Sequence, residues 1–186
     1  AAGISAIASF TMFLVNLSLG ETNAALVTAL LAGAAIGFLP YNFNPAKIFM
    51  GDTGAMFLGF ILSAVAIDAA VKSATAIALI VPILALGLPI FDTAFAILRR
   101  FVNGKPIMQA DKGHLHHRLM AIGLTQRQVV IYMYFISLSL GTCSIILAKM
   151  GAKQAMIAFF VVISFVLVSM RHFNLTHEEK KSTNSM

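Results

Sequence analysis

Apolar runs about as long as a lipid bilayer is thick dominate this sequence and restrict it to folds that cross membranes. Of its 186 residues, 59% are hydrophobic and 11% are charged, whereas soluble domains carry about 25% charged residues. A helix needs roughly 20 apolar residues to cross the hydrocarbon core, and no run alternates apolar and polar residues as a barrel strand does. We therefore predict an all-α fold, a polytopic membrane helical bundle. About six transmembrane helices are expected, at Ala2–Leu19, Ala24–Tyr41, Thr53–Val71, Ala74–Leu98, Val129–Ala148 and Ala155–Met170.

The fourth apolar run differs from the others because it contains helix-breaking residues. Proline inside a helix removes a backbone hydrogen bond and clashes with the preceding turn, so we predict a helix that is broken near Pro82–Pro89. The same run carries Asp92, and an acidic residue inside a membrane segment is a candidate functional residue. A structural pairing with Arg99 or Arg100 explains Asp92 equally well.

The basic residues divide unevenly between the two ends of the predicted bundle. Ten of the thirteen fall at one end and three at the other, and the positive-inside rule places the richer end in the cytoplasm. We predict a multi-pass protein of the cytoplasmic membrane with a membrane domain at residues 1–171, cytoplasmic loops at 42–52 and 99–128, and a cytoplasmic polar tail at 172–186. Basic residues scattered over loops in this way argue against a nucleic-acid-binding surface.

The first of two polar segments lies between the second and third apolar runs, from Asn42 to Gly54. It contains Asp52, and apolar residues resume at Ala55, so this carboxylate is expected at the start of a membrane helix. A helix N-cap is the structural explanation, because aspartate is a favoured cap and suits the positive end of the helix dipole. The functional explanation is a metal–diphosphate site, since Mg²⁺ binds one or two carboxylates together with substrate phosphates.

The second polar segment, residues 111–118, lies between the fourth and fifth apolar runs. It contains three histidines, at His114, His116 and His117. Their spacings do not match the usual pairs of zinc ligands, and Lys112 and Arg118 make the segment cationic, which favours anions over a metal. Imidazoles that titrate near neutrality suit phosphate binding. An amphipathic surface helix at about Leu115–Ile122, with solvated histidines, is the structural alternative.

Three segments of the sequence resemble motifs of a known family of membrane enzymes. Asn42–Gly54 reads NFNPAKIFMGDTG, Pro89–Thr93 reads PIFDT, and Asp111–Arg118 reads DKGHLHHR. In order and spacing they resemble the polyprenyl-phosphate N-acetylhexosamine-1-phosphate transferases, which include phospho-N-acetylmuramoyl-pentapeptide transferase. The histidine motif looks most like that of the undecaprenyl-phosphate N-acetylglucosaminyl-1-phosphate transferases, which start teichoic acid or other bacterial surface polymers.

The resemblance implies transfer of N-acetylhexosamine-1-phosphate, with GlcNAc-1-phosphate expected, from a UDP-sugar to undecaprenyl phosphate. UMP would be released and Mg²⁺ would be the cofactor, in the first membrane step of cell-wall or surface-polymer synthesis. The residues it assigns to catalysis are Asp52, which would also be the metal ligand, His114, His116 and His117. Those expected to bind substrate are Asn42, Phe49, Lys112 and Arg118, with Asn42 and Phe49 at positions that contact the nucleotide. The resemblance leaves open whether the protein forms a homodimer.

The family also carries two acidic segments upstream of the motif that contains Asp52. One is a paired-aspartate loop and the other ends in Asp-Gly-Leu-Asp-Gly. Neither occurs in this sequence, and Ala1–Gly3 resembles the residues directly after the second segment. We therefore expect the chain to be the C-terminal part of a longer transferase and to be inactive by itself.

Two other functions are compatible with the same residues. A membrane transporter or channel subunit would use Asp92 in the broken helix, because interrupted membrane helices often mark ion or substrate paths. A transporter needs its sites at the bilayer midplane, whereas Asp52 and the histidines are expected at the cytoplasmic edge. A non-catalytic membrane scaffold would use its loops to bind partners, and it predicts that substitution of Asp52 or His116 leaves sugar-phosphate transfer intact.

Overall fold

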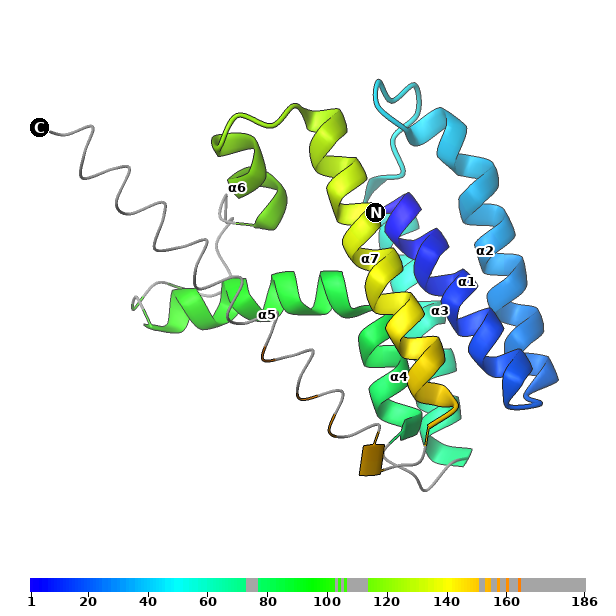
Figure 1. The fold of residues 1–186 in the computed structure, drawn as a ribbon. Helices are drawn as coiled ribbons and strands as arrows, with labels where there is room; N and C mark the ends of the chain where they lie inside the picture. Colours follow the sequence, from blue (N-terminus) through cyan, green and yellow to red (C-terminus); the bar gives the residue numbers. More distant parts are fainter. Residues whose placement is uncertain are drawn as a thin grey trace, which may run out of the picture.

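The computed structural model describes residues 1–72, 77–102, 104, 106, 114–150, 153, 154, 157, 160 and 164. Within these residues all regular secondary structure is helical, in seven helices (Figure 1). The all-α fold class expected from the sequence is confirmed. Most of the predicted span Ala155–Met170, all of the tail at 172–186 and Lys112 lie outside the described residues.

Three helices are long and apolar enough to cross a membrane: α2 (Thr22–Asn42), α3 (Gly51–Lys72) and α7 (Gln126–Ala148). Each coincides with a predicted span to within about three residues at either end, which is the precision that sequence patterns allow. Helix α1 (Ala2–Ser18) is also apolar and has 17 residues. At about 1.5 Å per residue the three long helices each extend over slightly more than 30 Å, close to the thickness of a hydrocarbon core.

The fourth predicted span is broken, as its prolines indicated. It forms α4 (Ile77–Ala85) and α5 (Gly87–Val102), which are bent by 85° relative to each other at Leu86. Pro89 explains the position of the break, because its missing N–H is the one that would bond to the carbonyl of Ala85 four residues earlier. In Figure 1, α5 runs crosswise to α4 and α7. The pair forms either one interrupted span or a re-entrant segment.

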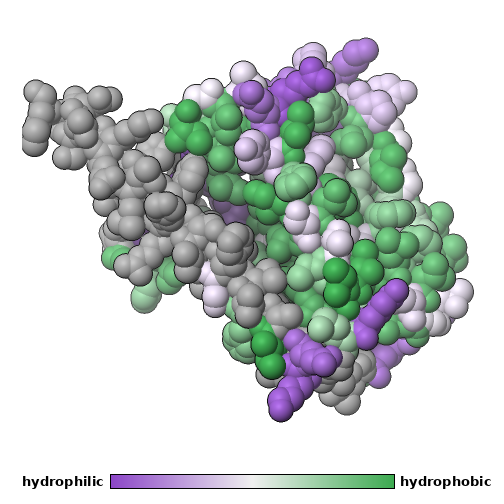
Figure 2. All heavy atoms as spheres, viewed as in Figure 1, coloured by the Kyte–Doolittle hydropathy of each residue, from purple (hydrophilic) through white to green (hydrophobic). Residues whose placement is uncertain are grey.

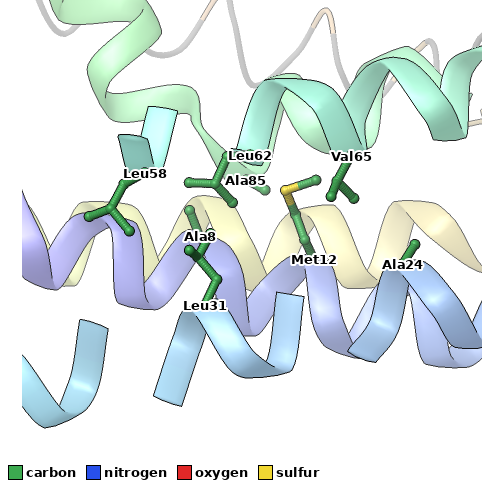
Figure 3. Close-up of a cluster of buried hydrophobic side chains, with 8 residues drawn as sticks. All are labelled: Ala8, Met12, Ala24, Leu31, Leu58, Leu62, Val65 and Ala85. Carbon is green, nitrogen blue, oxygen red and sulfur yellow. The ribbon is translucent and has the colours of Figure 1, made fainter. Parts of the chain in front are cut away.

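Helix α1 lies at the centre of the packing and contacts α2, α3, α4 and α7. Figure 3 shows the main hydrophobic cluster, to which all four of the first helices contribute. Its buried members are Ala8, Met12, Ala24, Leu31, Leu58, Leu62, Val65 and Ala85. Helices in a bilayer associate through close packing rather than through transfer of apolar surface from water, which suits a cluster that mixes alanines with larger side chains.

Small residues bring α1 and α7 together. A Cβ atom added at Gly141 would collide with Oγ1 of Thr11, and one added at Gly3 would collide with the Tyr134 ring. Both glycines therefore allow a partner side chain to occupy the space directly above the backbone, as at other close helix crossings in membranes. The Gly3–Tyr134 contact packs the first half of α7 against the start of α1.

On the face that Figure 2 shows, hydrophobic side chains cover most of the middle of the bundle, and hydrophilic ones gather mainly toward two opposite ends. At one end, Lys72 Nζ lies 2.7 Å from Asp68 Oδ2 and 3.3 Å from Glu21 Oε2, which joins the end of α3 to the residue before α2. Asp52 lies at the other end of α3, about 30 Å away along the helix. The long helices thus carry their polar groups near their ends, as expected of a membrane bundle.

Candidate active site at one end of the bundle

The loop between α2 and α3 is held in shape by its own hydrogen bonds. Tyr41 O accepts from Lys47 N at 2.8 Å and from Ile48 N at 3.1 Å, and Asn42 Nδ2 donates to Ile48 O at 2.9 Å. The Asn44–Pro45 peptide bond within it is cis. Asn42, which is expected to bind substrate, therefore uses one of its two side-chain N–H groups to close the loop.

Asp52 lies in the first turn of α3 and is exposed. Its carboxylate forms no hydrogen bond or ion pair with any other described residue. The helix begins at Gly51, so Asp52 lies one residue inside it, where a negative charge is favoured by the helix dipole. Phe49, two residues before the helix, is 81% exposed. Both side chains are therefore accessible from outside the bundle.

Aromatic and cationic side chains connect this loop to α7. The Phe43 ring lies 6.4 Å from the Tyr134 ring, and the Arg127 guanidinium carbon lies 5.9 Å from the Phe43 centroid. Arg127 belongs to the first turn of α7, directly after the segment that contains the histidines. In Figure 1 the α2–α3 loop and the start of α7 lie at the same end of the bundle. The described residues of the two polar segments, which were predicted to form one site, therefore lie toward this end.

The part of the second polar segment that carries His114, His116 and His117, called the histidine segment from here on, leads into a short helix, α6 (Leu115–Ala121). The surface helix expected at about Leu115–Ile122 is thereby confirmed. The turn after it passes through Gly123, whose φ of +97° suits glycine because other residues rarely adopt that region. Thr125 then starts α7 with a capping box, in which Thr125 N donates to Gln128 Oε1 at 2.9 Å and Gln128 N to Thr125 Oγ1 at 3.4 Å. Both ends of this connection are thus fixed by local sequence.

The three imidazoles lie side by side. The rings of His114 and His116 are nearly parallel, 9° apart with centroids 6.0 Å from each other, and the centroids of His116 and His117 are 4.1 Å apart. Burial lowers the pKa of His116, and the positive charges that His117 and His114 can carry lower it further, against the opposing effect of Asp92. A neutral ring is therefore favoured at the centre of the group. Of the three histidines, which the structural alternative expected to be solvated, only His117 is exposed, and His114 and His116 are partly buried.

Asp92 on α5 is joined directly to this segment. His114 Nδ1 lies 3.1 Å from Asp92 Oδ2, and the N–H of Leu115 donates to Asp92 Oδ1 at 2.8 Å. The Asp92 side chain is 17% exposed and that of His114 is 33% exposed. The sequence suggests only arginine partners for Asp92. No local pattern signals the contact with His114, which lies 22 residues away.

Arg118 brings positive charge to the same group. Its guanidinium carbon lies 5.8 Å from the centroid of the Phe95 ring on α5. Burial lowers the pKa of Arg118, and the like charge of Arg99 adds to this effect, while Asp92 partly offsets it. Arg118 and Arg99 thus bring fixed positive charge close to the Asp92 carboxylate and the histidines, a composition that suits a polyanionic ligand.

The structure groups most of the predicted site residues without completing a metal centre. No described set of three or more His, Cys, Asp or Glu side chains is arranged to hold a metal ion. No hydrogen bond or ion pair joins Asp52 to a described histidine. The residues that sequence reasoning missed are Phe43 and Arg127, which connect the two segments across 84 positions of sequence, a separation at which no residue pattern could reveal a pair.

Comparison with known proteins identifies related sequences. The model of glycosyl transferase family 4 matches residues 1–70. A Bacillus subtilis protein named probable undecaprenyl-phosphate N-acetylglucosaminyl 1-phosphate transferase is 40% identical over 181 residues, or 97% of this chain and 51% of the relative. Decaprenyl-phosphate N-acetylglucosaminephosphotransferase of Mycolicibacterium smegmatis is 36% identical over 156 residues, 77% of this chain and 38% of the relative. Its namesake from Mycobacterium tuberculosis is 41% identical over 121 residues, 59% of this chain and 30% of the relative.

No solved structure matches the chain. The chain spans about half the length of the Bacillus subtilis relative and smaller shares of the mycobacterial ones. Its apolar helices and these similarities indicate a multi-pass membrane protein. The chain is thus similar to glycosyl transferase family 4 over residues 1–70, and over most of its length to a protein named as a probable undecaprenyl-phosphate N-acetylglucosaminyl 1-phosphate transferase.

Proposed function

We propose that the whole protein transfers N-acetylhexosamine-1-phosphate, and GlcNAc-1-phosphate in particular, from a UDP-sugar to undecaprenyl phosphate with release of UMP. The reaction would be the first membrane step in the synthesis of a bacterial cell-wall or surface polymer, such as teichoic acid. The observation that carries the proposal is the 40% identity to the Bacillus subtilis relative over 97% of this chain. That relative and the two mycobacterial ones are all named for the transfer of GlcNAc phosphate to a polyprenyl phosphate.

The arrangement of the polar residues supports this chemistry. Two polyanions, a lipid phosphate and a nucleotide diphosphate, must meet at a membrane surface, so the main task of the protein is to position them and neutralise charge. An exposed carboxylate, three adjacent imidazoles and a partly buried guanidinium lie toward one end of a bundle with apolar sides. We infer from the distribution of basic residues that this end faces the cytoplasm, where nucleotide sugars are available.

The donor atoms at this end suit Mg²⁺ when a substrate supplies further oxygens. Asp52 offers an exposed carboxylate that has no partner among the described residues, and Mg²⁺ commonly binds one or two carboxylates together with phosphates. We propose Asp52 as a metal ligand. When bound, the ion would neutralise charge on the diphosphate. The remaining ligands would come from substrate, water and the rest of the protein.

The imidazoles and Arg118 would act on the phosphates directly. A protonated imidazole donates from both ring nitrogens, and a neutral one can accept a proton from the attacking phosphate or donate one hydrogen bond. Because burial favours the neutral form of His116, that ring suits proton transfer or hydrogen bonding rather than permanent charge neutralisation. Arg118 supplies the fixed positive charge. Phe49, exposed beside Asp52, would stack on the uracil ring, an interaction that contributes about 1–3 kcal/mol per base.

The transporter alternative finds less support. The broken helix that it requires exists, and Asp92 lies beyond the break. However, both Asp92 oxygens bind groups of the histidine segment, His114 and the backbone of Leu115. A carboxylate engaged in this way organises neighbouring residues rather than offering itself to a passing ion. The similar bacterial proteins are also named as transferases.

A transfer assay with purified full-length protein tests the proposal. UDP-GlcNAc labelled in the sugar is supplied with undecaprenyl phosphate and Mg²⁺ in detergent, and both the lipid-linked product and UMP are measured. We expect the two products in equal amounts, with UDP-GalNAc and UDP-N-acetylmuramoyl-pentapeptide as poorer donors. Absence of lipid-linked sugar with every donor would refute the transferase assignment, and a better donor than UDP-GlcNAc would refute the assigned sugar alone.

A further inference from the structure

The contact between Asp92 and the histidine segment uses both carboxylate oxygens. One accepts from the backbone N–H of Leu115 at 2.8 Å, and the other lies 3.1 Å from Nδ1 of His114. The carboxylate is 17% exposed, so water competes little for it. Asp92 is therefore more than a charge near the site: it binds a catalytic candidate and the first residue of the helix that carries the other two.

The contact with an ionised Asp92 favours one tautomer of His114. An ionised carboxylate can only accept hydrogen bonds, so the atom 3.1 Å from it, Nδ1, must be the donor. In the neutral ring Nε2 is then the bare nitrogen, and in the charged ring Nε2 is the site that has gained the proton. Proton exchange at His114 is thereby confined to Nε2. A carboxylate behind a histidine has this effect in other enzymes, where it sets tautomer and orientation.

The second bond extends the effect to the neighbouring rings. Leu115 begins α6, and its N–H is among those that a helix leaves without an internal partner. By accepting from it, Asp92 fixes where α6 starts and hence where His116 and His117 lie relative to His114. The nearly parallel rings of His114 and His116, 9° apart, are consistent with this anchoring.

The bend between α4 and α5 brings Asp92 into position. Asp92 lies five residues after Gly87, the first residue of α5, and α5 leaves the axis of α4 at 85°. In Figure 1, α6 lies beside α5 rather than beside α4. A continuous helix would carry Asp92 along the axis of α4 and away from α6. The break between α4 and α5 thus allows Asp92 to reach the start of α6.

We propose that Asp92 is a positioning residue for the histidine segment. It holds His114 in the tautomer with the proton on Nδ1, directs Nε2 of that ring to the substrate phosphates, and anchors the start of α6. The identity of those phosphates rests on the proposed function, whereas the tautomer and the anchoring do not.

The test uses Asp92→Asn in the full-length protein, because asparagine separates the two roles. Its carbonyl can still accept from Leu115, and asparagine caps helices as well as aspartate does. Its amide, however, would donate toward Nδ1 of His114 and so favour the opposite tautomer. Asp92→Glu retains a carboxylate and Asp92→Ala removes both bonds. Asp68→Asn, at the other end of the bundle, is the matched control.

Two readouts are measured on each variant. Nitrogen NMR of protein labelled with ¹⁵N in histidine, with His114→Gln used to assign the signals, reports which ring nitrogen carries the proton. Transfer kinetics report kcat and KM for UDP-GlcNAc. We expect Asp92→Asn to move the His114 proton to Nε2 and to lower kcat by about 10- to 100-fold with little change in KM. Asp92→Glu should restore part of both signals, and Asp68→Asn should resemble the wild type.

Other outcomes overturn the proposal. If His114 keeps its proton on Nδ1 in Asp92→Asn, or if that variant turns over at the wild-type rate, Asp92 does not position the ring. If the wild-type protein transfers no sugar phosphate at all, the proposed function fails, and the NMR comparison still decides whether Asp92 sets the tautomer. The two failures are therefore distinguishable.

Discussion

The guanidinium carbon of Arg127 lies 5.9 Å from the centre of the Phe43 ring, and this contact ties the loop before α3 to the first turn of α7. Phe43 also packs against Tyr134, which lies about two helical turns beyond Arg127 along α7. Through these contacts the segment that leads to Asp52 and the segment that follows the histidines become neighbours. One aromatic ring thus contacts side chains on both sides of the candidate site.

Removing that ring should loosen the loop. Phe43→Ala loses one aromatic pair and one cation–π contact, so we expect the protein to be destabilised by about 1–2 kcal/mol and its thermal midpoint to fall. Transfer activity should fall as well, because the loop carries the residues next to Asp52. Phe60→Ala is the matched control, since Phe60 lies on α3 with 69% of its surface exposed. Equal midpoints for the two variants would contradict the role of Phe43.

Asp52→Asn tests the proposed metal ligand. Asparagine keeps the size of the side chain and removes the charge, so the full-length variant should insert normally while transfer falls by at least about 100-fold. The Mg²⁺ concentration needed for half-maximal activity should rise in the residual reaction. Lys72→Ala should be nearly silent, because Lys72 forms exposed ion pairs at the opposite end of the bundle. Near-normal turnover of Asp52→Asn would remove this carboxylate from the site.

The pKa of His116 predicts a pH dependence of stability. Burial lowers this pKa below 6.5, helped by His117 and His114 and opposed by Asp92. Between the lowered value and 6.5 the unfolded chain binds more protons than the folded protein. Stability therefore falls as the pH drops through this window and is recovered above it. His116→Gln should lose less thermal stability than wild type between about pH 7.5 and about pH 5.5. An equal or larger loss in the variant would contradict the burial of this ring.

The close contact of α1 with α7 can be tested by a rescue experiment. Gly141→Ala places a Cβ against Oγ1 of Thr11, and overpacking of this kind typically costs about 1–3 kcal/mol. Adding Thr11→Ala removes the colliding oxygen, so the double variant should recover most of the lost thermal midpoint. Independent, additive losses in the two single variants would show that the helices do not meet at this point.

The sequence predicted the parts of the fold that depend on local chemistry. Helices α2, α3 and α7 were predictable because each is a long apolar run with polar residues at both ends. The break after Ala85 was predictable because Pro89 lacks the N–H that its carbonyl needs. The direction of α5 after the break was not, since an angle of 85° depends on packing against other helices rather than on the residues at the bend.

The residue types of the candidate site could be proposed from the sequence, but the contacts between those residues could not. Charge and spacing singled out Asp52 and the histidines as candidates, and Asp92 was singled out because it is an acidic residue within an apolar run. The partner of Asp92 was missed because His114 lies 22 residues away, beyond a polar connection whose path no pattern specifies. The contact of Phe43 with Arg127 was missed for the same reason, because the two residues are far apart in the sequence and Phe43 has no neighbour that distinguishes it from any other loop aromatic.

The most direct test asks whether the two polar segments face the same side of the membrane. Single cysteines replace Ile48 beside Asp52, Ile122 after the histidines and Val71 at the far end of α3, which are 52%, 45% and 80% exposed. Each is placed in full-length protein without native cysteines and labelled with a membrane-impermeant thiol reagent in sealed vesicles of known orientation. We predict that positions 48 and 122 react from the cytoplasmic side and position 71 from the opposite side. Reaction of positions 48 and 122 from opposite sides would contradict a shared active site.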